Sequence, residues 1–158
     1  MLGLTIRDML DIVPPEVLRF LIAKTKPDKT IAFDPGMGLL RLIDEYDRAA
    51  RAGDSREYEL SKINSPQSAI PFRHMTTVVQ IARDDDAIFS ILERSGYEII
   101  DREAVLDQAN RAKIWLERYA PEDAKFAISE TLPEIAANEP ANVKAAVAAY
   151  AAAIKDGE

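Results

Sequence analysis

Apolar residues recur at intervals of three and four along almost the whole chain, the spacing that one face of an α-helix produces. Stripes of this kind occupy residues 17–22, 39–46, 72–82, 105–119 and 143–154. A short extended segment is expected only at Lys29–Phe33, where it is closed by the turn residues Asp34-Pro35-Gly36. The pattern predicts an all-α protein, an irregular and cage-like array of about eight helices with at most one short extended segment.

Capping and helix-breaking residues indicate where several of these helices begin and end. Thr5 and Asp8 have the spacing of a capping box. Pro15 suits the first turn of the next helix, because proline lacks an N–H that would have no partner there. Gly53 and Gly96 stand where two further helices are expected to end.

The two C-terminal stripes differ in character. The first predicts a long helix that buries Val105, Ala109, Ala112 and Leu116, with Trp115 beside the stripe. The second belongs to a helix so rich in alanine that it needs a packing partner or is marginal alone.

Ser65–Pro71 is the best candidate for a domain boundary, since two prolines lie there among small polar residues. The sequence therefore predicts two helical parts, residues 1–64 and residues 65–158.

Composition narrows the range of functions. The 158 residues, 47% of them hydrophobic, suffice for one ordinary core or two small helical lobes. No apolar run is long enough to span a membrane, and no signal peptide is recognised. With no cysteine and one histidine, neither a disulfide framework nor a zinc site is expected, and a cytoplasmic location is consistent with the absence of cysteine.

The charge is unevenly distributed. The net charge is −7, which argues against an autonomous nucleic-acid binder. Residues 1–83 hold 12 basic and 11 acidic side chains, a balance of +1, whereas residues 84–158 hold 8 and 16, a balance of −8. A surface that faces phosphates is therefore expected in the N-terminal half.

The acidic and glycine motifs have ordinary structural explanations. Gly36-Met37-Gly38 lacks the third glycine of a dinucleotide-binding loop and is interpreted as a turn that opens a helix. The acidic run Asp44–Asp47 is typical of a solvated helix face, and Asp84–Asp86 of a helix N-terminus. We expect no metal site and no catalytic residue in this chain.

The basic residues are less easily assigned. Arg19, Lys24, Lys26 and Lys29 fall within eleven residues around a helix end and a turn, where the helix dipole alone favours lysine. Arg73 and the single histidine, His74, lie at the start of another helix. Neither group has the interleaved aromatic residues of a single-strand stacking platform.

The segment from Pro14 to Arg48, PPEVLRFLIAKTKPDKTIAFDPGMGLLRLIDEYDR, resembles the region just after the catalytic domain of class I lysyl-tRNA synthetases. A second block that is similar to the family is Pro71-Phe72-Arg73-His74-Met75 with the following Val78–Ala82. The resemblance is strongest over residues 5–48 and weak beyond about residue 120.

The resemblance implies a stem-contact region at residues 1–64 and part of a helical anticodon-binding domain at residues 65–158. No position matches the family's nucleotide-binding motifs or lysine pocket, so we expect the catalytic domain to be missing and the chain to be a piece that is truncated at both ends. We therefore do not expect this chain alone to activate lysine. ATP and Mg²⁺ would belong to the full-length enzyme, and no cofactor is expected here.

The partners implied by the resemblance are a lysine-accepting tRNA and the catalytic domain in cis, with neither DNA nor a membrane. Six residues are candidates for tRNA contact: Arg19, Lys24, Lys26, Lys29, Arg73 and His74. A different class of function stays open, that of a free-standing acidic helical module, derived from such a domain, that binds another protein.

Overall fold

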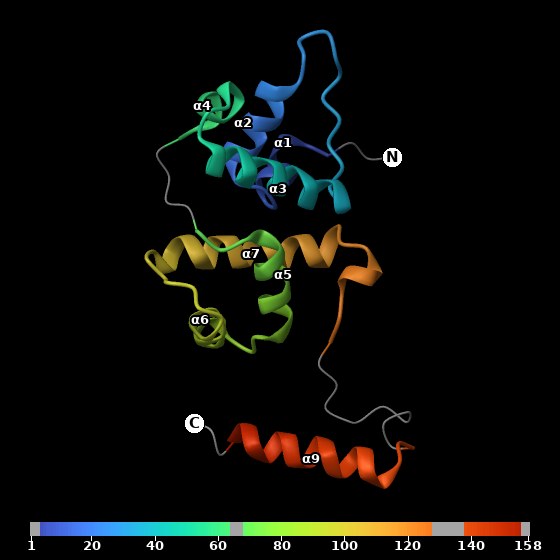
Figure 1. Cartoon of the computed structure of the whole chain (residues 1–158). Coiled ribbons are helices and arrows are strands. Elements are labelled where there is room, and N and C mark those ends of the chain that lie inside the picture. The colour runs from blue at the N-terminus through green and yellow to red at the C-terminus, as the bar shows by residue number, and fades with distance from the viewer. Residues whose placement is uncertain (1–3, 64–67, 128–137, 156–158) are drawn as a thin grey trace. The chain divides into compact units, whose positions relative to one another are not determined.

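The computed structural model describes residues 4–63, 68–127 and 138–155. In these residues it contains eight α-helices, one 3₁₀ turn and no β-strand (Figure 1). In chain order they are α1 (Ile6–Leu10), α2 (Pro15–Lys24), α3 (Met37–Ala52), α4 (Arg56–Ser61), α5 (Phe72–Ile81), α6 (Asp85–Arg94), α7 (Arg102–Arg118), η1 (Glu122–Ala124) and α9 (Ala141–Lys155). The all-α prediction is confirmed, and the expected extended segment Lys29–Phe33 is a loop between α2 and α3 that forms no strand.

The chain divides into two units, residues 1–127 and residues 128–158. The first holds α1 to α7 and η1. The second holds α9, an alanine-rich helix whose side chains from 141 to 152 are all exposed. The predicted boundary at Ser65–Pro71 falls between α4 and α5, in part on residues outside the described ranges, and it stays a prediction. Among the described residues, no helix combines the length and the apolar character needed to cross a bilayer.

The predicted helix caps form as expected. Thr5 and Asp8 make a complete capping box, in which the Asp8 N–H donates to the Thr5 hydroxyl at 3.2 Å and the Thr5 N–H donates to the Asp8 carboxylate at 2.9 Å. Pro15 occupies the first turn of α2. Gly53 and Gly96 follow α3 and α6 with φ of 71° and 84°, a left-handed conformation that glycine adopts at little cost.

One apolar core joins two groups of helices within the first unit. α2 packs mainly on α4 and α5 mainly on α7, while α3 contacts α2, α4 and α5. Near the first group, Tyr46 of α3 is buried and meets Phe20 of α2 edge to face, with ring centroids 5.7 Å apart. α3 therefore contributes to the core with one face and leaves the opposite face to solvent.

Trp115 is buried more deeply than the sequence pattern indicates. It is 1% exposed, its ring lies edge-on to Phe72 at 6.3 Å, and its indole N–H donates to the carbonyl of Pro35 at 2.7 Å. Leu116, expected on the buried stripe, is only half-buried. The face that α7 buries therefore differs from the one that the sequence pattern predicts, because this helix contacts the α2–α3 loop as well as α5.

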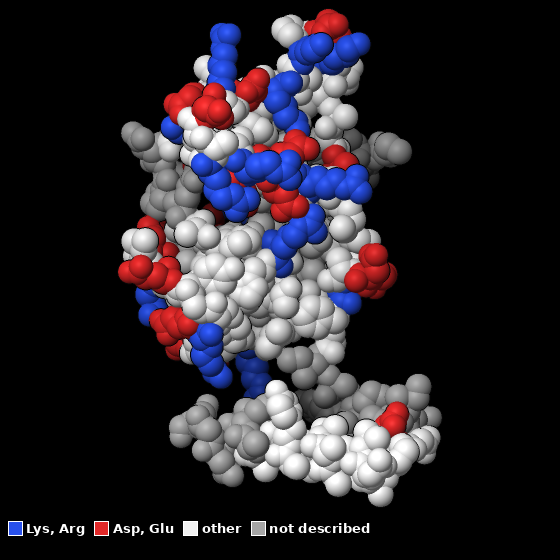
Figure 2. All heavy atoms as spheres, viewed as in Figure 1, with Lys and Arg blue, Asp and Glu red and all other residues white. Residues whose placement is uncertain are grey.

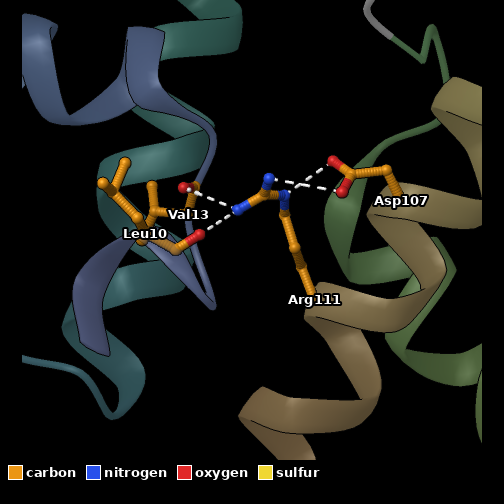
Figure 3. A network of polar contacts seen from close by, with 4 residues as sticks. All are labelled: Leu10, Val13, Asp107 and Arg111. Carbon is orange, nitrogen blue, oxygen red and sulfur yellow. Dashed lines mark hydrogen bonds and ion pairs between the residues drawn. The ribbon is translucent and has the colours of Figure 1, made fainter. Parts of the chain in front are cut away.

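Arg111 connects α7 to the turn between α1 and α2 (Figure 3). Its guanidinium donates to the backbone carbonyls of Leu10 and Val13, the latter at 3.1 Å, and pairs with Asp107 one helical turn earlier at 2.7 Å. The fork of N–H groups thus satisfies the carbonyl of Leu10 at the end of α1 and that of Val13 in the turn before α2. This contact fixes α7 against the N-terminal helices, although Arg111 and Leu10 are 101 residues apart in the sequence.

Replacing Arg111 by methionine should lower the free energy of unfolding by about 2 kcal/mol, since hydrogen bonds to a charged group contribute about 1.5–3 kcal/mol and the carbonyls would lose their donor. Chemical denaturation followed by circular dichroism measures this. Lysine at the same position should restore only part of the loss, because it lacks the planar fork. The matched control is Arg118→Met at the exposed end of α7, and an equal loss in both variants would contradict the contact's importance.

Candidate nucleic-acid interface

The glycine motif before α3 serves the helix itself. The Asp34 carboxylate accepts hydrogen bonds from the N–H groups of Gly36 and Gly38, each at 2.9 Å. A Cβ on Gly38 would lie 2.5 Å from the Asp34 side chain, so the glycine makes room for this cap. The motif is a turn that opens a helix, as expected.

Arg19 has a local structural role. From the exposed side of α2, its guanidinium donates to the carbonyls of Ser61 at 3.2 Å and Leu60 at 2.8 Å, at the end of α4. It therefore holds α4 against α2. Its assignment as a tRNA contact stays a prediction, and the two guanidinium N–H groups that donate to these carbonyls would not be the ones that bind a phosphate.

Two of the other candidates meet acidic residues of α3. Lys24 forms an ion pair with Glu45. Arg73, at the start of α5, pairs with Asp44 at 2.8 Å. Because Asp44 and Glu45 are neighbours on α3, the fold brings Lys24 and Arg73 from two different helices to the same exposed face.

Lys26 and Lys29 are exposed in the loop between α2 and α3. His74 lies apart from them, half-buried and stacked on Tyr97 with ring centroids 5.1 Å apart. The His74 Nε2 atom is buried and has no hydrogen-bond partner among the described residues. Of the six predicted contacts, only Lys24 and Arg73 meet on the exposed face of α3.

Sequence reasoning missed three arginines on this face. Arg41, Arg48 and Arg51 are exposed, and their spacing along α3 places them on one side of the helix together with Asp44 and Glu45. The sequence does contain a signal for them, because the three arginines recur at helical intervals on the face opposite the apolar residues Leu39, Leu42, Ile43 and Tyr46.

We call the five basic residues Lys24, Arg41, Arg48, Arg51 and Arg73 the α3 band. Figure 2 shows lysine and arginine side chains gathered over α3 on the viewed face, with acidic side chains among them. Asp44 and Glu45 neutralise Arg73 and Lys24, so the band carries a net charge of about +3, against −7 for the whole chain. Such a surface suits repeated phosphates.

The interpretation of the acidic run Asp44–Asp47 needs one correction. Asp44 and Glu45 lie on the solvated face, as expected, but Asp47 is half-buried and borders a cleft together with Ile43 and Tyr46 of the same helix. Burial raises the pKa of the Asp47 carboxyl, an effect that Arg51 opposes and Asp44 adds to.

The second acidic run behaves as predicted. Asp84 caps α6 by accepting the Ala87 N–H at 2.7 Å, while Asp85 and Asp86 lie near Lys113 and Arg102. In the part of the chain that the structure describes, no group of three or more acidic or histidine side chains could hold a metal ion.

The comparisons with known proteins agree with the resemblance in the sequence. The sequence model of the family described as tRNA synthetases class I (K) matches residues 2–69. The lysine–tRNA ligase of Methanosarcina barkeri is 44% identical over 96% of this chain. The chain is a relative of one part of the class I lysyl-tRNA synthetases.

Other archaeal lysine–tRNA ligases give the same result, with 45% identity over 78% of the chain for Picrophilus torridus and 40% over 80% for Archaeoglobus fulgidus. The match to Methanosarcina barkeri covers so much of the chain that the similarity to lysyl-tRNA synthetases extends past residue 120, where the sequence motifs were weak. The chain spans 26–30% of the length of these relatives.

Proposed function

We propose that this chain positions tRNA for a class I lysyl-tRNA synthetase, through contacts of the α3 band with the phosphate backbone of a lysine-accepting tRNA. The observation that carries the proposal is the basic face of α3 in a chain that is otherwise acidic. The relatives' names, all lysine–tRNA ligases, supply the kind of RNA and the reaction in which it is positioned.

Within this proposal the lysine and ATP chemistry belongs to a catalytic domain that works in cis with these helices. Mg²⁺ would be held with ATP there, and no described residue of this chain would hold either. The work would take place in the cytoplasm, where charged tRNA is used. The same proposal includes the division that the family resemblance implies, with a stem-contact part at residues 1–64 and an anticodon-binding part at residues 65–158.

The direct test is filter binding of lysine-accepting tRNA to the purified chain at a series of salt concentrations. Weak binding that falls steeply with salt is expected, because each phosphate contact releases counterions and contributes roughly 0.7–0.9 to the slope of log K against log salt. Failure to bind at about 20 mM salt would contradict the proposal.

Replacing Lys24, Lys26 and Lys29 together by alanine should weaken tRNA binding about tenfold at low salt, with unchanged helix content by circular dichroism. Lys26 and Lys29 extend from the loop beside α3, and each lost phosphate contact removes about one unit of salt slope. An affinity equal to wild type would mean that these lysines only complement the end of α2.

The alternative, an acidic module that binds protein, draws on the −8 balance of residues 84–158. It predicts that changes in the acidic half, and not in the α3 band, abolish binding to the physiological partner. The filter-binding series separates the two functions, since a protein-binding module need not retain RNA at low salt.

A further inference from the structure

One acidic side chain lies in the middle of the basic face of α3. Asp44 follows Arg41 by one helical turn and precedes Arg48 by another, so the three share a side of the helix. An acid at this place acts against RNA, because its charge has the same sign as that of a phosphate. By charge alone, Asp44 should therefore weaken the contact that we propose for the α3 band. Its ion pair with Arg73 leads to the opposite expectation.

Asp44 holds Arg73 by one edge of the guanidinium. The Nε and Nη2 atoms of Arg73 both lie 2.8 Å from Asp44 Oδ2. A guanidinium carries five N–H groups in one plane, and this contact occupies the edge that Nε and Nη2 form. The edge between Nη1 and Nη2 is left over, and its two parallel N–H groups are the fork that binds a phosphate through two oxygens.

The same ion pair brings a further guanidinium to α3. Arg73 is the second residue of α5, where the helix dipole is unfavourable for a cation. Its side chain nevertheless reaches α3 at Asp44, within the stretch of about 10 Å of helix axis that separates Arg41 from Arg48. Between those two positions α3 has no basic residue of its own. Arg73 therefore closes the gap in the row of arginines.

The ion pair contributes more to orientation than to stability. The Arg73 and Asp44 side chains keep 46% and 42% of their surface exposed, and ion pairs in such contact with water contribute little to folding. A long side chain that is free in solution loses rotamer freedom when it binds, which lowers affinity roughly 2- to 12-fold. An arginine that is already held in place loses less, so the Asp44 carboxylate prepares Arg73 for a phosphate before the RNA arrives.

We propose that Asp44 is a positioning residue of the interface, which holds Arg73 so that the free edge of its guanidinium binds one phosphate of the RNA backbone through two oxygens. This inference rests on the proposed function. Arg73 touches the phosphate, and Asp44 acts through Arg73. The neighbouring acid Glu45 has no such role, because its partner Lys24 carries a compact ammonium without a fork to orient.

A double-mutant cycle on Asp44 and Arg73 tests this role. The affinity for lysine-accepting tRNA is measured by filter binding at about 50 mM salt for the wild type, Asp44→Ala, Arg73→Gln and the double variant. Asp44→Ala should weaken binding about threefold and lower the salt slope, because one phosphate contact is partly lost. In the Arg73→Gln background the same change should leave the affinity equal or raise it, since only a repelling charge is removed.

The sign of the coupling decides between positioning and masking. If Asp44 only masked the charge of Arg73, Asp44→Ala would strengthen tRNA binding, and it would do so more in the wild-type background than in the Arg73→Gln background. Coupling of that sign, or no coupling, would overturn the inference and leave the proposed function intact. A wild-type chain that binds no tRNA would instead overturn both.

Two further variants separate orientation from charge. Asp44→Glu keeps the carboxylate and should bind within about twofold of the wild type. Asp86→Ala breaks another exposed aspartate–arginine pair, with Arg102, outside the band, and should bind like the wild type. All variants should keep the wild-type helix content by circular dichroism. Equal losses of affinity in Asp44→Ala and Asp86→Ala would refute the role of position 44.

The orientation of Arg73 can also be measured without RNA. In the ¹⁵N-labelled chain, the Nε–H signal of Arg73 is the one that disappears in Arg73→Gln. Its heteronuclear NOE should indicate restricted motion in the wild type and the fast motion of a free side chain in Asp44→Ala. Equal mobility of this group in both proteins would overturn the positioning role, whatever the affinities.

Discussion

Replacing Arg41, Arg48 and Arg51 together by glutamine should weaken binding of lysine-accepting tRNA roughly 100-fold at low salt. Each arginine–phosphate hydrogen bond is expected to contribute about 1 kcal/mol or more, and every 1.4 kcal/mol is a tenfold change in affinity. The salt slope should fall by about two to three units, one for each lost phosphate contact. Filter binding between about 20 and 200 mM salt measures both quantities.

None of the three arginines lies within ion-pair distance of an acidic side chain among the described residues, and Arg51 acts on Asp47 through its charge alone, so their loss should leave the fold intact. The control is Arg83, Arg94 and Arg118 changed to glutamine, three exposed arginines outside the band with the same total change of charge. If binding depended on net charge alone, both triple variants would lose the same affinity. That outcome would contradict a defined interface on α3.

The local structure could be predicted from the sequence because its determinants are close together along the chain. The capping box of Thr5 and Asp8 and the left-handed Gly53 depend on residues within one or two turns. The same holds for the Asp84 cap, which turns an acidic cluster into an ordinary helix start.

The candidate interface was only partly predictable. Sequence reasoning selected Lys24 and Arg73, but their meeting on α3 requires the packing of α2 and α5 against that helix. Arg19 could not be distinguished from a surface lysine or arginine, because its partners are backbone carbonyls 41 and 42 residues away. The arginines of α3 form no cluster along the sequence, because Arg41, Arg48 and Arg51 are separated by one or two helical turns, and only the helical period of 3.6 residues places them on one face.

The cleft beside Asp47 could not be predicted at all. The acidic residues at its border, Glu16, Asp47, Glu103 and Asp107, come from three helices, α2, α3 and α7, that are far apart in the sequence. Only the meeting of α2, α3 and α7 gives Asp47 its partly buried environment and its raised pKa. Because burial raises this pKa above the ordinary value of 3.8, the stability that Asp47 contributes is lost as the pH rises from that value through the pKa of the folded state, and the loss is then constant at higher pH.

Trp115→Ala should lower the free energy of unfolding by about 3–5 kcal/mol, the largest change in stability that we expect from one residue. The substitution removes a fully buried ring, its edge contact with Phe72 and its hydrogen bond to the Pro35 carbonyl. Because a loss of this size approaches the whole stability of many small domains, Trp115→Phe provides a milder test. It keeps an aromatic ring but leaves the carbonyl without its donor, at a cost of about 1–3 kcal/mol.

Leu116→Ala is the control, because the sequence pattern and the structure disagree on whether Leu116 or Trp115 is the more deeply buried residue of α7. The pattern places Leu116 on the buried stripe and Trp115 beside it, whereas the structure reverses the order of burial. Urea denaturation should be followed by far-ultraviolet circular dichroism, since Trp115 is the only tryptophan and its fluorescence is lost in two of the variants. A greater loss of stability in Leu116→Ala than in Trp115→Ala would mean that α7 presents a different face to the core.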